Sequence, residues 1–569
     1  MLFNRKSCNK DPGPDESGQW GVYGRESAYA PTATKDGPTQ TMPGVGRRRH
    51  RIVPGLAIAA VGTVLLPVGL AGIYVGFQHA DHVRTARKTA AVKPYTAPPL
   101  SWGVCHAAVP GGTRPSARSE CAQLTVPLDY TNPARGTIQI ALIRIKATDQ
   151  AQRMGSLVFN FGGPGGSGVQ TLPPLASQLT KLGTRYDLVS FDPRGVGQSA
   201  PVTCNDASKR QDDMQSITWH LDNEKELAAA AATQRAVADS CKRHSGWLLP
   251  YVGTVNAARD MDVLRVALGE AKLNFFGFSY GTQLGANYAH QFPHRVGRMV
   301  LDGAVDTRPS QKQADLQQTA GFQRALADFA QWAGQQPEAK ALRGTKDQTL
   351  NKITALFGEL ETNPIAHDGG LLFTRDQARG LLADDLYSKT QWPQVLKMME
   401  SIAARDGEAL SALLSESDQG DTASGYAQTA ITCADYSDRY SEQDVKTALP
   451  QFTGTSPVFG ADAGALMACT GWPVQGDDAG RQVSAPGAPP IVVVGNTGDP
   501  ATPYAWAPAL AKELGPGVLV TLQGGQGHTS YITGNTCVDR TVNGYLLDGT
   551  VPANGTTCTA TTDPPTTSN

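Results

Sequence analysis

The sequence has no surplus of charge of either sign, because its 50 Lys and Arg residues are matched by 51 Asp and Glu residues. A nucleic acid or another polyanion is therefore not an expected partner. The sequence also lacks a CxxC pair, a Cys/His spacing typical of zinc sites and an internal repeat. We therefore expect neither a metal nor a cofactor.

The chain of 569 residues is too long for one compact domain, so we expect a core with a large insertion. Residues 52–77 contain no charged side chain, and the run is about long enough to cross a bilayer of roughly 30 Å. Arginines at 47, 48, 49 and 51 precede it, as the positive-inside rule requires for a cytoplasmic N-terminus. We predict a disordered cytoplasmic tail (1–51), a transmembrane anchor (52–77) and a linker (78–101).

A signal peptide that is cleaved on export is the alternative explanation of residues 52–77. The run is longer than a normal signal core, and no clean small-x-small cleavage site follows it at Phe77–Ala80. We therefore favour a single-pass protein of the cell membrane with its catalytic domain outside, and keep secretion after cleavage as the alternative. A buried core helix is a third explanation.

The distribution of cysteines agrees with export. Cys8 lies before the apolar run, and an even number of cysteines lies after it, which suggests disulfides. Scattered free thiols are the alternative. Sequence alone cannot fix the connectivity, but nearest-neighbour pairing would close four short loops: Cys105–Cys121, Cys204–Cys241, Cys433–Cys469 and Cys537–Cys558.

From about Trp102 onwards, short apolar runs alternate with helical stretches, which predicts a mainly parallel sheet covered by helices on both faces. The predicted strands are 137–145, 157–160, 188–191, 273–276, 299–301, 491–494 and 518–522, and the predicted helices are 227–242, 257–268 and 282–291. Between 306 and 485 the alternation gives way to helical sequence such as 311–335 and 392–404. We predict a core (102–305 and 486–569) with a helical lid (306–485) inserted over the carboxyl edge of the sheet.

The strongest local motif is Gly277-Phe278-Ser279-Tyr280-Gly281, which lies between a predicted strand and a predicted helix. A G-x-S-x-G motif in this context is typical of a nucleophile elbow, a sharp turn that exposes the serine hydroxyl. An ordinary Gly-Ser turn is the alternative. The motif predicts Ser279 as the nucleophile of an α/β-hydrolase.

A serine hydroxyl needs a base, and the base needs an acid that orients it. In α/β-hydrolases these follow the serine in the order acid, then histidine. His528 lies in a glycine-rich loop after the last predicted strand and is the candidate base. Asp499, which follows the strand 491–494, is the favoured acid, and Asp302, after the strand 299–301, is its rival.

The oxyanion hole requires two backbone N–H groups. One should come from Tyr280, and the other from the glycine-rich loop that follows the strand 157–160. Pro164 has no N–H, so Gly163 is the better donor. This loop lacks the lysine of a P-loop and the G-x-G-x-x-G of a Rossmann turn, which argues against a nucleotide site.

A set of motifs extends over the region from about Trp102 to Cys558: Asp260-Met261-Asp262, Phe276–Thr282, Phe292-Pro293, Arg295-Val296, Met299–Gly303, Phe191–Ser199, Gly498–Pro503 and Gly527-His528. Together they resemble the tripeptidyl-aminopeptidase branch of the prolyl aminopeptidase family, exported actinobacterial serine exopeptidases with the α/β-hydrolase fold. Asn160–Gly168 resembles the family's H-G-G-P-G loop, although Asn160-Phe161 replaces the usual histidine.

This resemblance implies release of short peptides, expected to be tripeptides as in the family, from free N-termini through an acyl-enzyme on Ser279. Such an enzyme must bind the α-ammonium of its peptide substrate, and Asp435, near the end of the lid, is one candidate, although a structural aspartate is the plainer explanation. An esterase or amidase acting on small molecules is the main alternative function. A hydrolase-fold binding module without catalysis is the most distant one. We expect a monomer.

Overall fold

The computed structural model describes residues 95, 97–105, 118–204, 221, 223–367, 371–417 and 422–560. The chain divides into two units, Met1–Arg87 and Lys88–Asn569, and the described residues all belong to the second, which is compact. The predicted tail (1–51), the predicted anchor (52–77) and most of the predicted linker therefore lie outside them. None of the helices within the described ranges is both long enough and apolar enough to cross a membrane.

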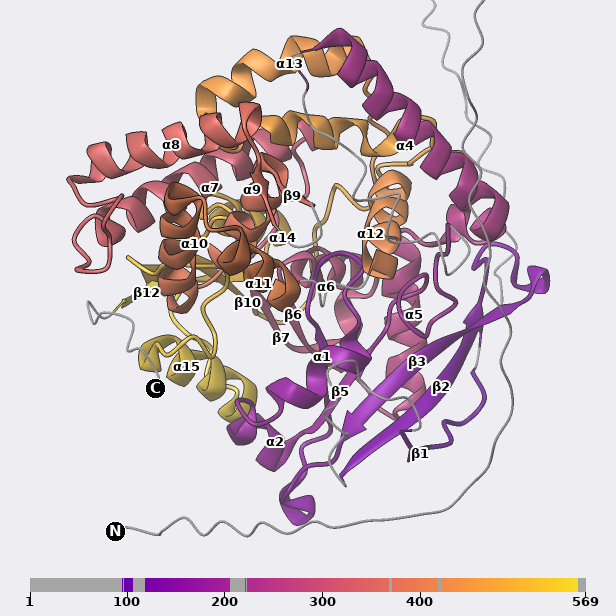
Figure 1. The fold of residues 1–569 in the computed structure, drawn as a ribbon. Helices are drawn as coiled ribbons and strands as arrows, with labels where there is room; N and C mark the ends of the chain where they lie inside the picture. Colours follow the sequence, from indigo (N-terminus) through magenta and orange to yellow (C-terminus); the bar gives the residue numbers. More distant parts are fainter. Residues whose placement is uncertain are drawn as a thin grey trace, which may run out of the picture. The chain divides into compact units, whose positions relative to one another are not determined.

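The second unit is built on a ten-stranded sheet with the order β1-β2-β3-β5-β4-β6-β7-β10-β11-β12 (Figure 1). Pairing is antiparallel from β1 to β5 and parallel from β5 through β4 to β12. The strands are β1 (Gly103–Val104), β2 (Ser119–Pro127), β3 (Thr137–Ile145), β4 (Ser156–Asn160), β5 (Asp187–Phe191), β6 (Leu273–Phe278), β7 (Val296–Asp302), β10 (Ile491–Asn496), β11 (Gly517–Gln523) and β12 (Thr556–Thr559).

All seven predicted strands are present, and the mainly parallel sheet is confirmed. The edge strands β1 and β12 and the strand β2, which lies next to β1, were not predicted. β2 mixes polar and apolar residues with an irregular burial pattern, and β1 and β12 contain only two and four residues. Short strands, and strands whose burial follows no regular alternation, carry little apolar periodicity from which they could be predicted.

Helices cover both faces of the sheet. Along β10, Ile491 and Val493 pack into one apolar cluster while Val492 and Val494 pack into another, since successive side chains of a strand point to opposite faces. The first face is covered by α5 (Thr254–Ala267), α6 (Tyr280–Gln291) and α14 (Trp506–Leu514), and the second by α1 (Gly168–Leu175), α2 (Thr180–Arg185) and α15 (Thr536–Asn543).

The segment between β7 and β10 is mainly helical, as the sequence predicts, and has an apolar core of its own around Phe329, Ile353 and Met399. Figure 1 shows its helices gathered in the upper part of the view. They are α7 (Gln311–Ala333), α8 (Lys346–Thr362), α9 (Arg375–Asp385), α10 (Trp392–Ala404), α11 (Gly407–Ser417), α12 (Thr422–Asp435) and α13 (Glu442–Thr455), with the hairpin of β8 (Ile365–Ala366) and β9 (Leu372–Phe373) and the 3-10 segment η7 (Gly460–Cys469). We refer to residues 306–485 as the lid.

The lid also packs against a helix from the first part of the chain. Helix α4 (Glu224–Ser245), which precedes the nucleophile strand in the chain, packs Leu227 and Ala231 against Val445 and Phe452 of α13. The first part of the chain therefore contributes a helix to the packing of the lid.

Four disulfides join neighbouring cysteines in the chain. Their pairs are Cys105–Cys121, Cys204–Cys241, Cys433–Cys469 and Cys537–Cys558, which is the nearest-neighbour pairing. Four disulfides are typical of proteins that fold in an oxidising compartment outside the cytoplasm.

A buried ion pair fixes the turn after β5. Arg194 has no exposed surface, and its Nε and Nη2 donate to the two carboxylate oxygens of Asp260 in α5 at 2.7 and 2.6 Å. The guanidinium also donates to the backbone oxygens of Pro127, Leu128 and Tyr251. Every donor of this buried cation has an acceptor, which is the condition for burying a charge at tolerable cost.

We predict that Asp260→Asn lowers the free energy of unfolding by about 3–5 kcal/mol, because it leaves the Arg194 charge buried and uncompensated. Chemical denaturation of the purified protein measures the loss. Glu224→Gln, which removes the exposed partner of Lys446, is the control and should unfold at the same denaturant concentration as the wild type. Equal effects of the two substitutions would contradict a structural role of the Arg194 pair.

Candidate active site

Ser279 lies on the turn between β6 and α6, with φ 55° and ψ −125°. This conformation is strained for a residue other than glycine, and such strain is typical of a nucleophile elbow. The turn is tight: a Cβ on Gly277 would collide with the backbone of Gly281, and one on Gly281 would lie 2.6 Å from the oxygen of Asn160. The Ser279 N–H donates to the Asp302 backbone oxygen at 2.9 Å, which ties the turn to the end of β7.

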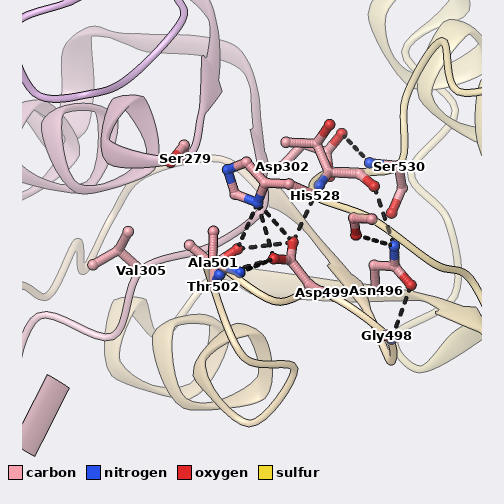
Figure 2. A network of polar contacts seen from close by, with 12 residues as sticks. Ser279, Asp302, Val305, Asn496, Gly498, Asp499, Ala501, Thr502, His528 and Ser530 are labelled. Atoms are coloured by element: carbon pink, nitrogen blue, oxygen red, sulfur yellow. Dashed lines mark hydrogen bonds and ion pairs between the residues drawn. The ribbon is translucent and has the colours of Figure 1, made fainter. Parts of the chain in front are cut away.

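The structure brings His528 and Asp499 together at the carboxyl ends of β11 and β10. His528 Nδ1 lies 2.9 Å from both carboxylate oxygens of Asp499. The opposite nitrogen, Nε2, is buried and has no hydrogen-bond partner within the described residues. Figure 2 shows the imidazole ring between Asp499 and Ser279, so that the free nitrogen is available to a serine hydroxyl.

The pKa of His528 results from opposing influences. Burial lowers it, but the charge of Asp499, its hydrogen bond to Nδ1 and the charge of Asp302 outweigh burial and raise the pKa above the usual value. The neutral imidazole, which is the form that can accept a proton, therefore requires a higher pH than for an ordinary histidine.

Asp302, the rival acid, occupies a different position. Its Oδ2 accepts hydrogen bonds from the backbone N–H groups of Ser530 and Tyr531, at 3.0 and 2.8 Å, and not from the His528 ring. Burial raises the pKa of Asp302 to about 6, against the effect of these two hydrogen bonds. Of the two candidates, the structure brings only Asp499 within hydrogen-bond distance of the imidazole.

The predicted oxyanion donors also lie at the elbow. A Cβ on Gly162 would be 2.9 Å from Ser279 Cβ, so the glycine-rich loop runs directly beside the serine. The Gly163 N–H donates no hydrogen bond within the described part of the chain. Tyr280 is the first residue of α6, where backbone N–H groups have no partner in the helix. Gly163, Ser279 and Tyr280 border the same cavity.

This cavity, of about 350 Å³, lies between the elbow and the lid. Asp435 borders it, as a substrate-binding role would require, but its carboxylate already accepts hydrogen bonds from the N–H and the hydroxyl of Thr254. Asp315 of α7 also borders the cavity, and its Oδ2 is buried without a hydrogen-bond partner among the described residues. Among the residues that the structure describes, no group of three or more His, Cys, Asp or Glu side chains could hold a metal ion.

Sequence reasoning did not find Asp315, although a signal exists. Gln311, Ala314, Asp315 and Gln318 all border the cavity, and their spacing places them on one face of a helix. This spacing could have shown that one mainly polar face of a lid helix is turned towards the sheet.

A mainly parallel sheet with a strained serine after β6, an aspartate after β10 and a histidine after β11 has the arrangement of an α/β-hydrolase. The protein is a serine hydrolase of this fold.

Comparisons with known proteins specify the family. A family model described as TAP-like protein matches residues 456–558. The chain is 34% identical over 510 residues to the serine protease Hip1 of Mycobacterium tuberculosis, covering 82% of this chain and 92% of that protein. It is 32% identical over 461 residues to the tripeptidyl aminopeptidase of Streptomyces coelicolor, covering 77% and 83%. Carboxylesterase B of M. tuberculosis is 33% identical over 493 residues, covering 82% and 91%.

Among solved structures, a proline iminopeptidase-related protein from Thermus thermophilus aligns with 76% of this chain and 98% of its own, at 15% identity and a TM-score of 0.34. The sequence relatives decide the assignment. The chain belongs to the tripeptidyl-aminopeptidase-like family, and it is a serine hydrolase of the peptidase type.

We predict that Ser279→Ala abolishes labelling by a fluorophosphonate, and that Asp499→Asn slows labelling by about 10⁴-fold because the histidine loses the partner that fixes its tautomer. The labelling rate of the wild type should rise with pH, and the pKa of this rise should lie above that of an ordinary histidine. In Asp499→Asn this rise should occur at lower pH, since burial then lowers the pKa of His528 without the opposing carboxylate of Asp499. If Asp302→Asn caused the larger loss, Asp302 would be the acid.

Proposed function

We propose that the protein is a serine exopeptidase that releases short peptides, in the first instance tripeptides, from free N-termini. Ser279 is the nucleophile, His528 the base and Asp499 the acid that orients it. The observation that carries the proposal is the cavity beside Ser279, to which the lid contributes carboxylates. One of them, Asp315, has an Oδ2 that is buried and has no partner among the described residues.

The proposed mechanism uses the geometry of this site. His528 Nε2 takes the proton of the Ser279 hydroxyl as the serine oxygen attacks the substrate carbonyl, and the N–H groups of Gly163 and Tyr280 stabilise the oxyanion. The same nitrogen then protonates the leaving amine, which releases the C-terminal remainder of the peptide. Water activated by His528 hydrolyses the acyl-enzyme and frees the N-terminal fragment.

Recognition of a free N-terminus requires acidic groups, because burying an unpaired ammonium costs several kcal/mol. Burial, with the charge of Asp462, raises the pKa of Asp315 to about 7. Burial also raises the pKa of Asp435 to about 7, although the two hydrogen bonds from Thr254 oppose the shift. An ammonium that enters the cavity would favour the ionised form of both carboxylates. Asp315 is the primary partner of the amine, since its Oδ2 has no partner in the described part of the chain, and Asp435 adds a second negative charge.

An esterase is the second candidate function. It is favoured by the similarity to a relative named carboxylesterase B, and the same triad would serve it. An esterase for uncharged acyl groups has no need of buried carboxylates next to its nucleophile, which is why we rank it second. If simple acyl esters were cleaved as fast as free tripeptide amides, the esterase function would be favoured.

We predict that N-acetylation of a tripeptide amide lowers kcat/KM severely, and that Asp315→Asn lowers kcat/KM for the free-amine substrate by roughly 10²-fold or more, because it removes one partner of a buried charge pair. The kcat/KM for the acetylated substrate should change far less in Asp315→Asn. Asp347→Asn, an exposed lid aspartate in α8, is the matched control and should not alter the preference. Equal losses on both substrates would assign Asp315 a structural role.

The pH dependence separates recognition from chemistry. The ratio of kcat/KM for free over acetylated peptide cancels the titration of His528, which both substrates share. This ratio should rise through about pH 7 as the cavity carboxylates ionise, and should fall near pH 8 as the substrate amine loses its proton. A ratio that does not vary between pH 5 and 8 would contradict recognition by these carboxylates.

We also propose that residues 52–77 anchor the exported enzyme to the membrane. The apolar run with its preceding arginines supports the anchor, and the four disulfides support folding outside the cytoplasm. Intact mass and N-terminal sequencing of protein from the membrane fraction should show residues 52–77 retained, and non-reducing peptide mapping should show the four pairs. A mature N-terminus after residue 77 would favour secretion.

A further inference from the structure

Two lid residues, Tyr387 and Ser388, lie against the loop that carries His528, and we name them the lid strap. The His528 backbone N–H donates to the Tyr387 oxygen at 2.7 Å, and Ser388 forms an antiparallel bridge with Gly527. The edge of one ring faces the other between Tyr387 and His528, with centroids 5.0 Å apart and an interplanar angle of 79°. The lid strap therefore contacts both the backbone and the imidazole of the candidate base.

The lid strap and the loop are packed without intervening space. Gly527 has φ +95°, and a Cβ at this position would lie 2.6 Å from the Tyr387 oxygen and 3.2 Å from Ser388 Cα. On the opposite side, the Asn496 amide at the end of β10 donates to the Gly527 oxygen at 2.8 Å. The loop is thus held between the core and the lid strap.

Helix α7 of the lid makes corresponding contacts with the loop that carries the acid. Arg324 Nη2 donates to the backbone oxygen of Asp499 at 2.5 Å, and Gln318 Nε2 donates to that of Ala501 at 2.7 Å. The lid therefore supports both loops whose side chains form the Asp499–His528 pair, and it does so through hydrogen bonds to their backbone groups.

We infer that Tyr387, with Ser388, is a positioning residue for the catalytic base: the seated lid strap fixes His528 in the orientation that Ser279 requires. This inference rests on the proposed role of His528 and goes beyond it, since the lid would then be part of the catalytic apparatus as well as a filter for substrates. A general base displaced by about 1 Å can lose about 10²-fold in rate. Displacing the lid strap should thus slow the chemistry even for a reagent that has no contact with the peptide subsites.

The test is Gly527→Ala, compared with Gly534→Ala as a matched control. Both glycines have nearly the same positive φ, +95° and +96°, so both substitutions impose similar backbone strain, but a Cβ on Gly534 meets no atom within 4 Å. The readout is the rate of inactivation by a small fluorophosphonate, together with kcat and KM for a tripeptide amide and the melting temperature. We expect Gly527→Ala to be inactivated about 10²-fold more slowly than Gly534→Ala, with a matching loss in kcat and little change in KM.

A second pair of variants keeps the inference falsifiable if Gly527→Ala fails to fold. Tyr387→Phe retains the ring that faces the imidazole, whereas Tyr387→Ala removes it, so Tyr387→Ala should be labelled several-fold more slowly than Tyr387→Phe. If the lid strap only lines the cavity, KM for peptides will rise in Tyr387→Ala while labelling rates stay equal, and that result would overturn the inference. Absence of labelling in the wild type would instead refute the proposed function.

Discussion

The buried carboxylate of Asp499 holds together the loops at the carboxyl edge of the sheet. It accepts hydrogen bonds from the backbone N–H groups of Ala501, Thr502 and Thr529, from the Thr502 hydroxyl and from the imidazole of His528. A buried anion is stable only when its oxygens are fully partnered. The requirement to satisfy this one charge therefore fixes the loop after β10, the loop after β11 and the direction of the imidazole at the same time.

The sheet supplies the frame on which this interaction depends. β6, β7, β10 and β11 are adjacent and parallel, so the turn of Ser279 and the loops of Asp499 and His528 emerge at the same edge. Asp302, at the end of β7 between them, accepts hydrogen bonds from Ser530 and Tyr531 and thereby anchors the far side of the histidine loop. Asp302, the alternative acid candidate from the sequence, thus supports the loop of His528, whereas Asp499 contacts its imidazole.

Much of this arrangement could be predicted from the sequence, because the central strands are continuous apolar runs and the elbow requires glycines at fixed positions. The spacing of Asp499 and His528 after such runs was equally visible. Strand β2 was not visible in the same way, since it mixes polar and apolar residues and its burial follows no regular alternation. Asp315 was recognisable only through the helical spacing of the residues that border the cavity. The contact of Tyr387 with His528 could not be predicted, because it depends on how the lid folds back over the sheet, and nothing in the local sequence specifies it.

In the proposed mechanism, the lid contacts both the substrate and the loops that carry the catalytic side chains. Its α7 carries Asp315 towards the cavity and, less than three turns later, Arg324 onto the backbone of Asp499. The helix that carries the proposed partner of the substrate amine is therefore also the helix that contacts the loop of Asp499, the proposed acid. Under the proposed mechanism, a substrate that binds both Asp315 and Ser279 joins the lid to the core and would favour the contact of the lid strap with His528. Binding energy from the N-terminus of a peptide would then stabilise the geometry of the reaction, and a substrate without that amine would lack this contribution.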